Sequence, residues 1–286
     1  MTGRALPAPA RPIFDRLLPP MLLGFAPLAF ASLLALPGPA PAAAPCVVPA
    51  TPVVAPLGKP QPLPITLKAD DKTELSADYY APMGVKDELV PGVLLVHDQG
   101  RTTDDLRDLA ETLASKGLGV LLLELRAHGA NAKPDYNWKD SDEKQQKAIW
   151  AFASKDVQAG AEFLAGRKEL HRSKLIVIGH GKGCSLAIEQ ALRNHNTLAT
   201  VLIEPAKKVY DFDLTKSLTE LDGIPTLLVC GKGGKKEMAQ VQEACTPKNV
   251  AEPSCEVSCL SSPAEKVLED KKLAKTVFLF LAQHME

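Results

Sequence analysis

Short apolar runs alternate with amphipathic stretches over most of this 286-residue sequence, and this alternation constrains the fold more than any other feature. Runs such as 92–97 (GVLLVH) and 118–125 (LGVLLLEL) are almost continuously apolar, as expected of strands buried on both faces of a parallel sheet. The runs expected to form such strands are 92–97, 118–125, 174–179, 198–203, 224–229 and 255–260.

Amphipathic segments between these runs are expected to form helices. In one of them Leu106, Leu109 and Leu113 recur at intervals of three and four residues. The expected helices are 102–116, 144–165, 182–195, 236–244 and 264–283. A β-hairpin is expected at 65–81, before the first of these helices. Helices that connect parallel strands by right-handed crossovers produce a three-layer α/β/α sandwich, here in a single domain.

The first 64 residues differ from the rest, because they hold 16 of the 24 prolines. Three arginines precede an uncharged run at 17–45, and small residues close it, an order typical of a secretory signal peptide. We expect a signal peptide at 1–44, a proline-rich linker at 45–64 and a globular domain at 65–286. Two alternatives stay open. The run is long enough for a membrane span, although its prolines disfavour a helix, and Cys46 is a lipidation candidate.

The chain carries 33 basic and 34 acidic residues, a net charge of −1 that argues against nucleic-acid binding. Removal of 1–44 leaves 30 basic and 33 acidic residues, a net charge of −3. The expected location is periplasmic or extracellular. Membrane contact is expected only if the N-terminus stays uncleaved or Cys46 is lipidated.

Six cysteines remain after the expected cleavage, and an oxidising compartment would permit disulfides among them. We expect Cys245 to pair with Cys255 or Cys259, which lie close to it in sequence; buried free thiols are the alternative. No metal is expected, because no C-x-x-C or H-x-x-x-H spacing is present. The run 232–236 (KGGKK) lacks the pattern of a phosphate-binding loop, and no cofactor is expected.

From residue 65 to about 285 the chain resembles the α/β-hydrolase superfamily, as in dienelactone hydrolases and serine esterases. GVLLVHDQG (92–100) is similar to the third strand and oxyanion loop of that family, and LASKGLGVLLLELRAHG (113–129) to the helix and strand that follow. KLIVIGHGKG (174–183) is similar to the nucleophile strand and its elbow. The resemblance implies a mostly parallel, eight-stranded sheet.

The elbow of this family reads G-x-S-x-G, a sharp turn that presents a serine nucleophile. Here the five residues are Gly179, His180, Gly181, Lys182 and Gly183. The flanking glycines are kept, but Gly181 stands at the nucleophile position. Glycine adopts the positive φ of an elbow without strain and offers no group to attack a carbonyl. Gly181 is therefore interpreted as a vestigial nucleophile position.

The resemblance places the catalytic acid after the seventh strand and the histidine after the eighth. Residues 231–234 (GKGG) contain no acid, and residues 261–264 (SSPA) contain no histidine. Glu204, at the end of the sixth strand, matches an alternative acid position, and we interpret it as a surface or capping carboxylate. No catalytic residue is expected.

The oxyanion hole is the part of the site that the resemblance leaves intact. The backbone N–H groups of Gln99 and Lys182 match its two donors, and Lys182 also starts a helix, where anions are favoured. A small anionic or acyl ligand could bind there without being hydrolysed. A crevice that holds only water is the other interpretation.

A rearranged catalytic site is the alternative, in which Cys184 acts with Glu204 and His128 or His180. A reactive cysteine needs exposure and a nearby base. We expect instead that Cys184 is buried beneath the elbow, that His128 braces a loop, and that His180 points into the structure.

Three aromatic residues, Tyr136, Trp138 and Trp150, lie in or just after a polar segment that follows the strand at 118–125. They either shape a ligand pocket at the carboxyl ends of the strands or pack that segment against the domain.

These features predict an exported, non-catalytic pseudo-hydrolase that serves as a binding or interaction domain, with a small ligand or a protein partner. The alternative is a hydrolase of esters or related acyl substrates that uses the rearranged site.

Overall fold

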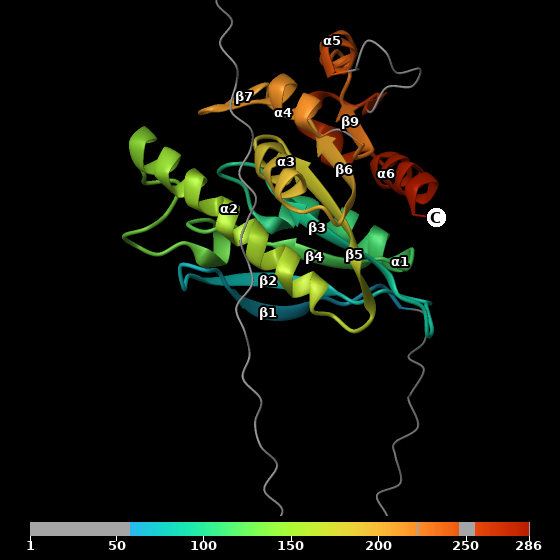
Figure 1. Ribbon diagram of the computed structural model, residues 1–286. Helices are drawn as coiled ribbons and strands as arrows, with labels where there is room; N and C mark the ends of the chain where they lie inside the picture. Colours follow the sequence, from blue (N-terminus) through green and yellow to red (C-terminus); the bar gives the residue numbers. More distant parts are fainter. Residues whose placement is uncertain (1–57, 222, 246–254, 286) are drawn as a thin grey trace, which may run out of the picture. The chain divides into compact units, whose positions relative to one another are not determined.

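A sheet of eight strands forms the centre of the computed structural model, which describes residues 58–221, 223–245 and 255–285. In spatial order the strands are β1 (Leu63–Lys68), β2 (Glu74–Tyr80), β4 (Gly119–Leu123), β3 (Val90–Val96), β5 (Leu170–His180), β6 (Thr197–Ile203), β9 (Thr226–Cys230) and β10 (Cys255–Cys259). β2 is antiparallel to both of its neighbours, and every other pair is parallel (Figure 1). The expected mostly parallel, eight-stranded sheet is confirmed.

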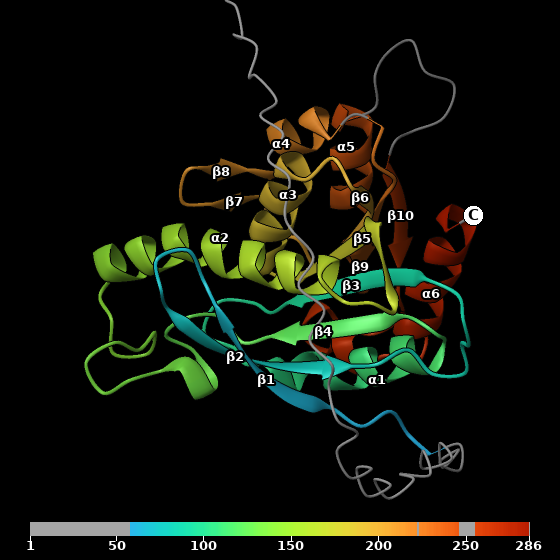
Figure 2. The ribbon, with the colours of Figure 1, turned by 60° about the horizontal axis from the view of Figure 1, so that its bottom comes forward.

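Helices cover both faces of this sheet, as Figures 1 and 2 show. One face packs against α1 (Arg107–Ser115) and α6 (Leu273–His284). The other packs against α2 (Glu143–Ala165), α3 (Gly183–Arg193), α4 (Leu214–Glu220) and α5 (Lys235–Cys245). The buried apolar side chains accordingly form two clusters, one on each side of the sheet. The three-layer α/β/α sandwich is therefore confirmed.

The sequence explains why α2 lies close to the sheet. Asp142 accepts from the backbone N–H of Gln145, and the Gln145 side chain accepts in return from the backbone N–H of Asp142, so the helix begins with a capping box. Further along, a Cβ added at Gly160 would lie 2.9 Å from Cδ1 of Leu94. The absence of a side chain at Gly160 lets the helix approach β3 closely.

Two of the expected elements differ in extent from the structure. β5 begins at Leu170, four residues before the apolar run that predicts it. The helix expected at 264–283 is divided into a 3-10 helix (Ala264–Glu269) and α6. Asp270 separates them, because its carboxylate accepts from the Ser262 hydroxyl at 2.6 Å and from the Lys272 backbone N–H at 2.9 Å.

The segment between β6 and β9 contains structure that the apolar pattern did not predict. A short hairpin of β7 (Lys208–Val209) and β8 (Phe212–Asp213) precedes α4, whose first turn is capped by Asp213. These elements are too short to show a hydrophobic period.

The expected signal peptide at 1–44 and most of the expected linker lie outside the described residues. β1 starts at Leu63, inside the expected linker, and the described residues all belong to one compact unit, Ala55–Glu286. Within the described part of the chain, no helix is long and apolar enough to cross a bilayer.

Candidate functional site

A tight turn at the end of β5 leads directly into α3. Gly181, at the centre of the turn, has a φ of +56°, a conformation that glycine adopts without strain. A Cβ added at Gly179 would lie 2.6 Å from Cα of Cys184, so glycine permits this close approach of strand and helix. The turn has the geometry of a nucleophile elbow, with no side chain at its nucleophile position.

The carboxylate of Asp98 fills the space above Gly181. Its Oδ1 accepts from the backbone N–H of Gln99 at 2.8 Å and from that of Lys182 at 2.7 Å. A Cβ added at Gly181 would lie 2.5 Å from both carboxylate oxygens, which is closer than real Cβ contacts allow. The two donors expected to form an oxyanion hole therefore do converge on one acceptor, and that acceptor belongs to the chain itself.

Sequence reasoning did not select Asp98. It follows β3 in the segment HDQG and looks like an ordinary loop carboxylate. Only the glycine at position 181 hinted that another group could occupy the missing side chain's space. Asp98 fills the space above Gly181 because the loop after β3 lies against the start of α3.

The histidine before Asp98 holds the backbone in place. Nδ1 of His97 lies 2.8 Å from the carbonyl oxygen of Asp98, and Nε2 accepts from the backbone N–H of Leu125 at 3.0 Å. Nε2 also lies 3.1 Å from Oε1 of Glu124, the residue that follows β4. The ring fixes the loop that positions Asp98.

His128 braces a second loop, as expected from the sequence, and this arrangement predicts a pH dependence. Nδ1 lies 2.7 Å from the Arg126 carbonyl oxygen, and Nε2 accepts from the Gly100 backbone N–H at 3.1 Å. Burial lowers the pKa of His128 from 6.5 to about 4. The unfolded chain therefore binds more protons between these two values, and stability falls as the pH falls through that window.

We expect His128 to remove about 2 kcal/mol from the free energy of unfolding between pH 7 and pH 5. Urea unfolding at the two pH values measures this change. His128→Gln, which cannot protonate, should show a pH dependence smaller by that amount. An equal pH dependence in the variant and the parent would contradict the assignment of a neutral His128.

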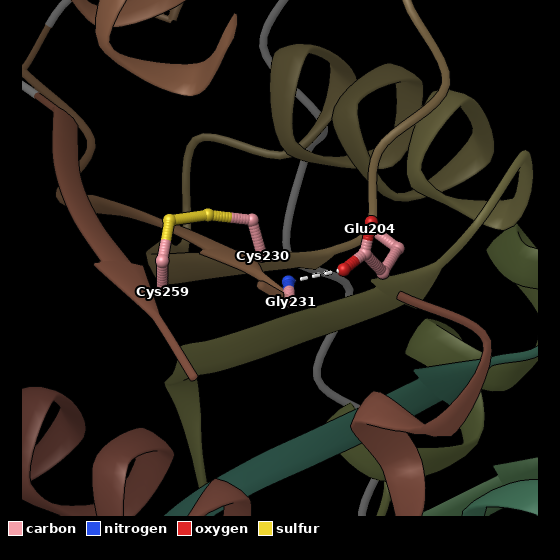
Figure 3. Close-up of a disulfide and its surroundings, with 4 residues drawn as sticks. All are labelled: Glu204, Cys230, Gly231 and Cys259. Atoms are coloured by element: carbon pink, nitrogen blue, oxygen red, sulfur yellow. Dashed lines mark hydrogen bonds between the residues drawn. A yellow bond between two sulfur atoms is a disulfide. The ribbon is translucent and has the colours of Figure 1, made fainter. Parts of the chain in front are cut away.

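The two segments that would hold the acid and the histidine pack against each other. Directly after β9, the backbone N–H of Gly231 donates to Oε1 of Glu204 (Figure 3). The next N–H, of Lys232, donates to the Ser262 carbonyl at 2.7 Å. A Cβ added at Gly231 would lie 2.7 Å from both the Ser262 carbonyl oxygen and the Ala264 nitrogen. Position 231 therefore has no room for an acidic side chain.

Glu204 lies at the end of β6 and is half-buried. It follows β6 with a φ of +49°, and its side chain accepts from the Gly231 N–H. Burial raises the pKa of this carboxyl group. Within the described residues no hydrogen bond or ion pair joins Glu204 to a histidine.

A disulfide joins the ends of these strands, with a pairing that differs from the expected one. Cys230 and Cys259 are bonded (Figure 3), so the predicted Cys245–Cys259 pair is wrong. The reason is the register of β9 and β10, which places Cys259 directly opposite Cys230. The Cys245–Cys255 pair stays a prediction, because the Cys245 side chain lies outside the described residues.

The residues of the alternative catalytic site are not brought together as a nucleophile and base. Cys184 is 1% exposed, its Sγ lies 3.6 Å from the Ile203 carbonyl oxygen, and burial raises the pKa of its thiol. The hydroxyl of the next residue, Ser185, donates to the Lys182 carbonyl at 2.9 Å. His180 is half-buried and lines the cavity beside Gly181, and burial lowers its pKa.

A cavity of about 660 Å³ lies above the elbow, between the loop after β3 and the 3-10 helix. Arg101 and Arg107 contribute the positive charges of its lining. The carboxylates that line it are Asp98, Asp104, Asp105, Asp108, Glu204, Glu265 and Glu269. The excess of carboxylates disfavours anionic ligands. Among the described residues no group of three or more histidine, cysteine or acidic side chains is arranged to hold a metal ion.

No protein-family model and no curated protein sequence matches the chain. Solved structures do match. An esterase from Pyrococcus furiosus superimposes with a TM-score of 0.60 at 16% identity, over 79% of this chain and 92% of the esterase. A dienelactone hydrolase from Anabaena variabilis gives 0.55 at 16% identity, over 79% and 97%. An α/β hydrolase from a Penicillium species gives 0.60 at 11% identity, over 79% and 99%. These likenesses, with the sheet order, show that the chain has the α/β-hydrolase fold.

Proposed function

We propose that this protein is an exported, non-catalytic pseudo-hydrolase that acts as a binding or interaction domain. The observation that carries the proposal is the Asp98 carboxylate, which accepts from both oxyanion-hole donors above Gly181. A tetrahedral oxyanion needs those donors free to stabilise it. An acyl substrate bound here would meet a negative charge and no nucleophile.

The remaining catalytic positions support the same proposal. Gly231 has no room for an acid, and no histidine follows β10 in the described segment 260–285 before His284, at the end of α6. The alternative hydrolase would need Cys184 as its nucleophile, but a buried thiol with a raised pKa forms little thiolate. Hydrolysis through a rearranged site is therefore the weaker proposal.

Export is the second part of the proposal. The Cys230–Cys259 disulfide is compatible with an oxidising compartment, where such bonds persist. The order of basic, apolar and small residues at the N-terminus supports cleavage near residue 44. Mass spectrometry of the protein recovered from the native host measures the mature N-terminus. An intact residue 1 in the mature protein would contradict export with cleavage.

Activity assays test the non-catalytic assignment. We expect the purified protein to hydrolyse p-nitrophenyl acetate and butyrate no faster than buffer and to resist a fluorophosphonate probe, and we expect peptide mapping after iodoacetamide treatment of the folded protein to find Cys184 unlabelled. Cys184→Ala should behave in the same way as the parent. Turnover that Cys184→Ala abolishes would overturn the proposal in favour of the rearranged site.

A further inference from the structure

A second cavity, of about 480 Å³, lies beside the N-terminal half of α2. The turn between β1 and β2 and the segment after β4 form its other walls, and Figure 2 shows this turn next to α2. We call it the α2 pocket and define it by Asp71, Arg126, Asp135, Tyr136, Gln145 and Phe152. It shares no lining residue with the cavity above the elbow, and its volume lies in the usual range of small-molecule sites.

Two aromatic rings of the α2 pocket are open to solvent. Tyr136 is 36% exposed and Phe152 is 48% exposed, which makes them two of the few large apolar side chains left uncovered in the described residues. By contrast, Trp138 and Trp150 are 8% and 5% exposed and pack into the domain. Of the three aromatic residues singled out in the sequence, Tyr136 is thus the exposed one.

The charges around the α2 pocket disfavour an anion. Arg126, 4% exposed, donates to Asp71 at 2.8 Å and to Asp156 through both Nε and Nη2. The lining itself carries two carboxylates, Asp71 and Asp135, against the single guanidinium of Arg126, which Asp156 also pairs from outside the lining. An anionic ligand would meet a net negative wall.

The same pocket also disfavours a cation at its aromatic surface. The Arg126 guanidinium carbon lies 5.7 Å from the centre of the Phe152 ring, and Nζ of Lys155 lies 5.5 Å from it. The electron-rich faces that would attract a ligand cation already have positive groups near them. The ligand that fits both conditions is uncharged.

The polar groups at the rim specify what an uncharged ligand must offer. Oε1 of Gln145 accepts from the Asp142 backbone N–H at 2.9 Å, which fixes the amide and leaves its NH₂ group as the donor. The carboxylates of Asp71 and Asp135 accept hydrogen bonds, and the Tyr136 hydroxyl can do either. Hydroxyl groups, which both donate and accept, match this mixture, and exposed rings suit an apolar C–H face.

We propose that the α2 pocket binds a pyranose ring of a neutral carbohydrate, with the ring packed on Tyr136 and against the exposed part of the Phe152 side chain, and its hydroxyls bonded to Asp71, Asp135 and Gln145. The proposal does not depend on the state of the elbow. A failed ester assay and a failed saccharide-binding assay would therefore bear on different claims.

Binding of three neutral saccharides, cellotriose, maltotriose and triacetylchitotriose, to the full-length protein tests this site. Saturation-transfer NMR and calorimetry should detect at least one of them with a Kd of about 1 mM or tighter. Phe152→Ala and Tyr136→Ala should each weaken that Kd at least about tenfold. Both side chains are partly exposed, so both variants should fold, and circular dichroism checks this.

Leu279→Ala provides the matched control, because Leu279 is 53% exposed on α6, on the opposite face of the sheet. This variant should bind as the parent does. Absence of binding by all three saccharides would overturn the proposal. Unchanged binding in both aromatic variants would do the same, as would equal or tighter binding of glucosamine or galacturonate, which carry a charge.

Discussion

Replacing Cys230 and Cys259 together by serine is expected to lower the free energy of unfolding by about 3–4 kcal/mol. The disulfide closes a loop between residues 29 apart in sequence, and it fastens the edge strand β10 to β9. Without the bond, the unfolded chain gains the entropy of an open loop. In the folded state β10 would then be attached to the sheet through its pairing with β9 alone. Urea unfolding of the oxidised parent and the double variant measures the difference.

Reduction of the parent gives the matched control for this prediction. With dithiothreitol present in both samples, so that any Cys245–Cys255 bond is also reduced, the parent should unfold at nearly the same midpoint as the double variant. A variant that loses less than about 1 kcal/mol would show that the packing of β10 against β9 and α5 already determines the stability of this edge.

Gly181→Ser restores the elbow serine, and it is expected to destabilise the protein without creating an esterase. A non-glycine residue at this positive φ costs about 1–2 kcal/mol, and forcing its Cβ against the Asp98 carboxylate adds about 1–3 kcal/mol. The sum is about 2–5 kcal/mol in the free energy of unfolding. No rate increase is expected, because the Asp98 carboxylate already accepts from both oxyanion-hole donors.

A double-mutant cycle separates the two causes. In an Asp98→Ala background the steric cost should vanish, so that Gly181→Ser then costs only the backbone term of about 1–2 kcal/mol. Additive effects of the two substitutions would show that Asp98 does not occupy the space of the missing side chain. Appearance of p-nitrophenyl ester hydrolysis in the single variant would show that a base stands within reach of position 181.

The buried parallel strands could be predicted from the sequence because they are continuous apolar runs. β3 and β4 are buried almost throughout, and a strand covered on both faces leaves that pattern in any sequence. The elbow could be recognised for a similar reason, since Gly179 and Gly183 meet backbone atoms that exclude a side chain. Packing of this kind restricts individual positions to apolar residues or to glycine, so it can be recognised in the sequence.

The parts that escaped prediction depend on which segments meet in space. Asp98 and Lys182 are 84 residues apart, and no local pattern links a loop carboxylate to a distant helix start. The disulfide was assigned from sequence proximity, whereas the register of two parallel strands decides it. Three separate segments of the chain form the α2 pocket, and Tyr136 was the one residue of its lining that the sequence marked as a candidate pocket residue.

The hydrogen bonds of Asp98 also bear on how the fold holds itself together. An unliganded hydrolase leaves its oxyanion donors without a protein acceptor, and active sites commonly sacrifice stability in this way. Here the same two N–H groups tie the loop after β3 to the first turn of α3. On the proposed function, the donors that bind the substrate oxyanion in enzymes of this fold bind a side chain of the protein here, and so stabilise the native state. Restoring catalysis would require breaking the two hydrogen bonds of Asp98. Any gain in hydrolytic activity is therefore expected to come with a loss of stability.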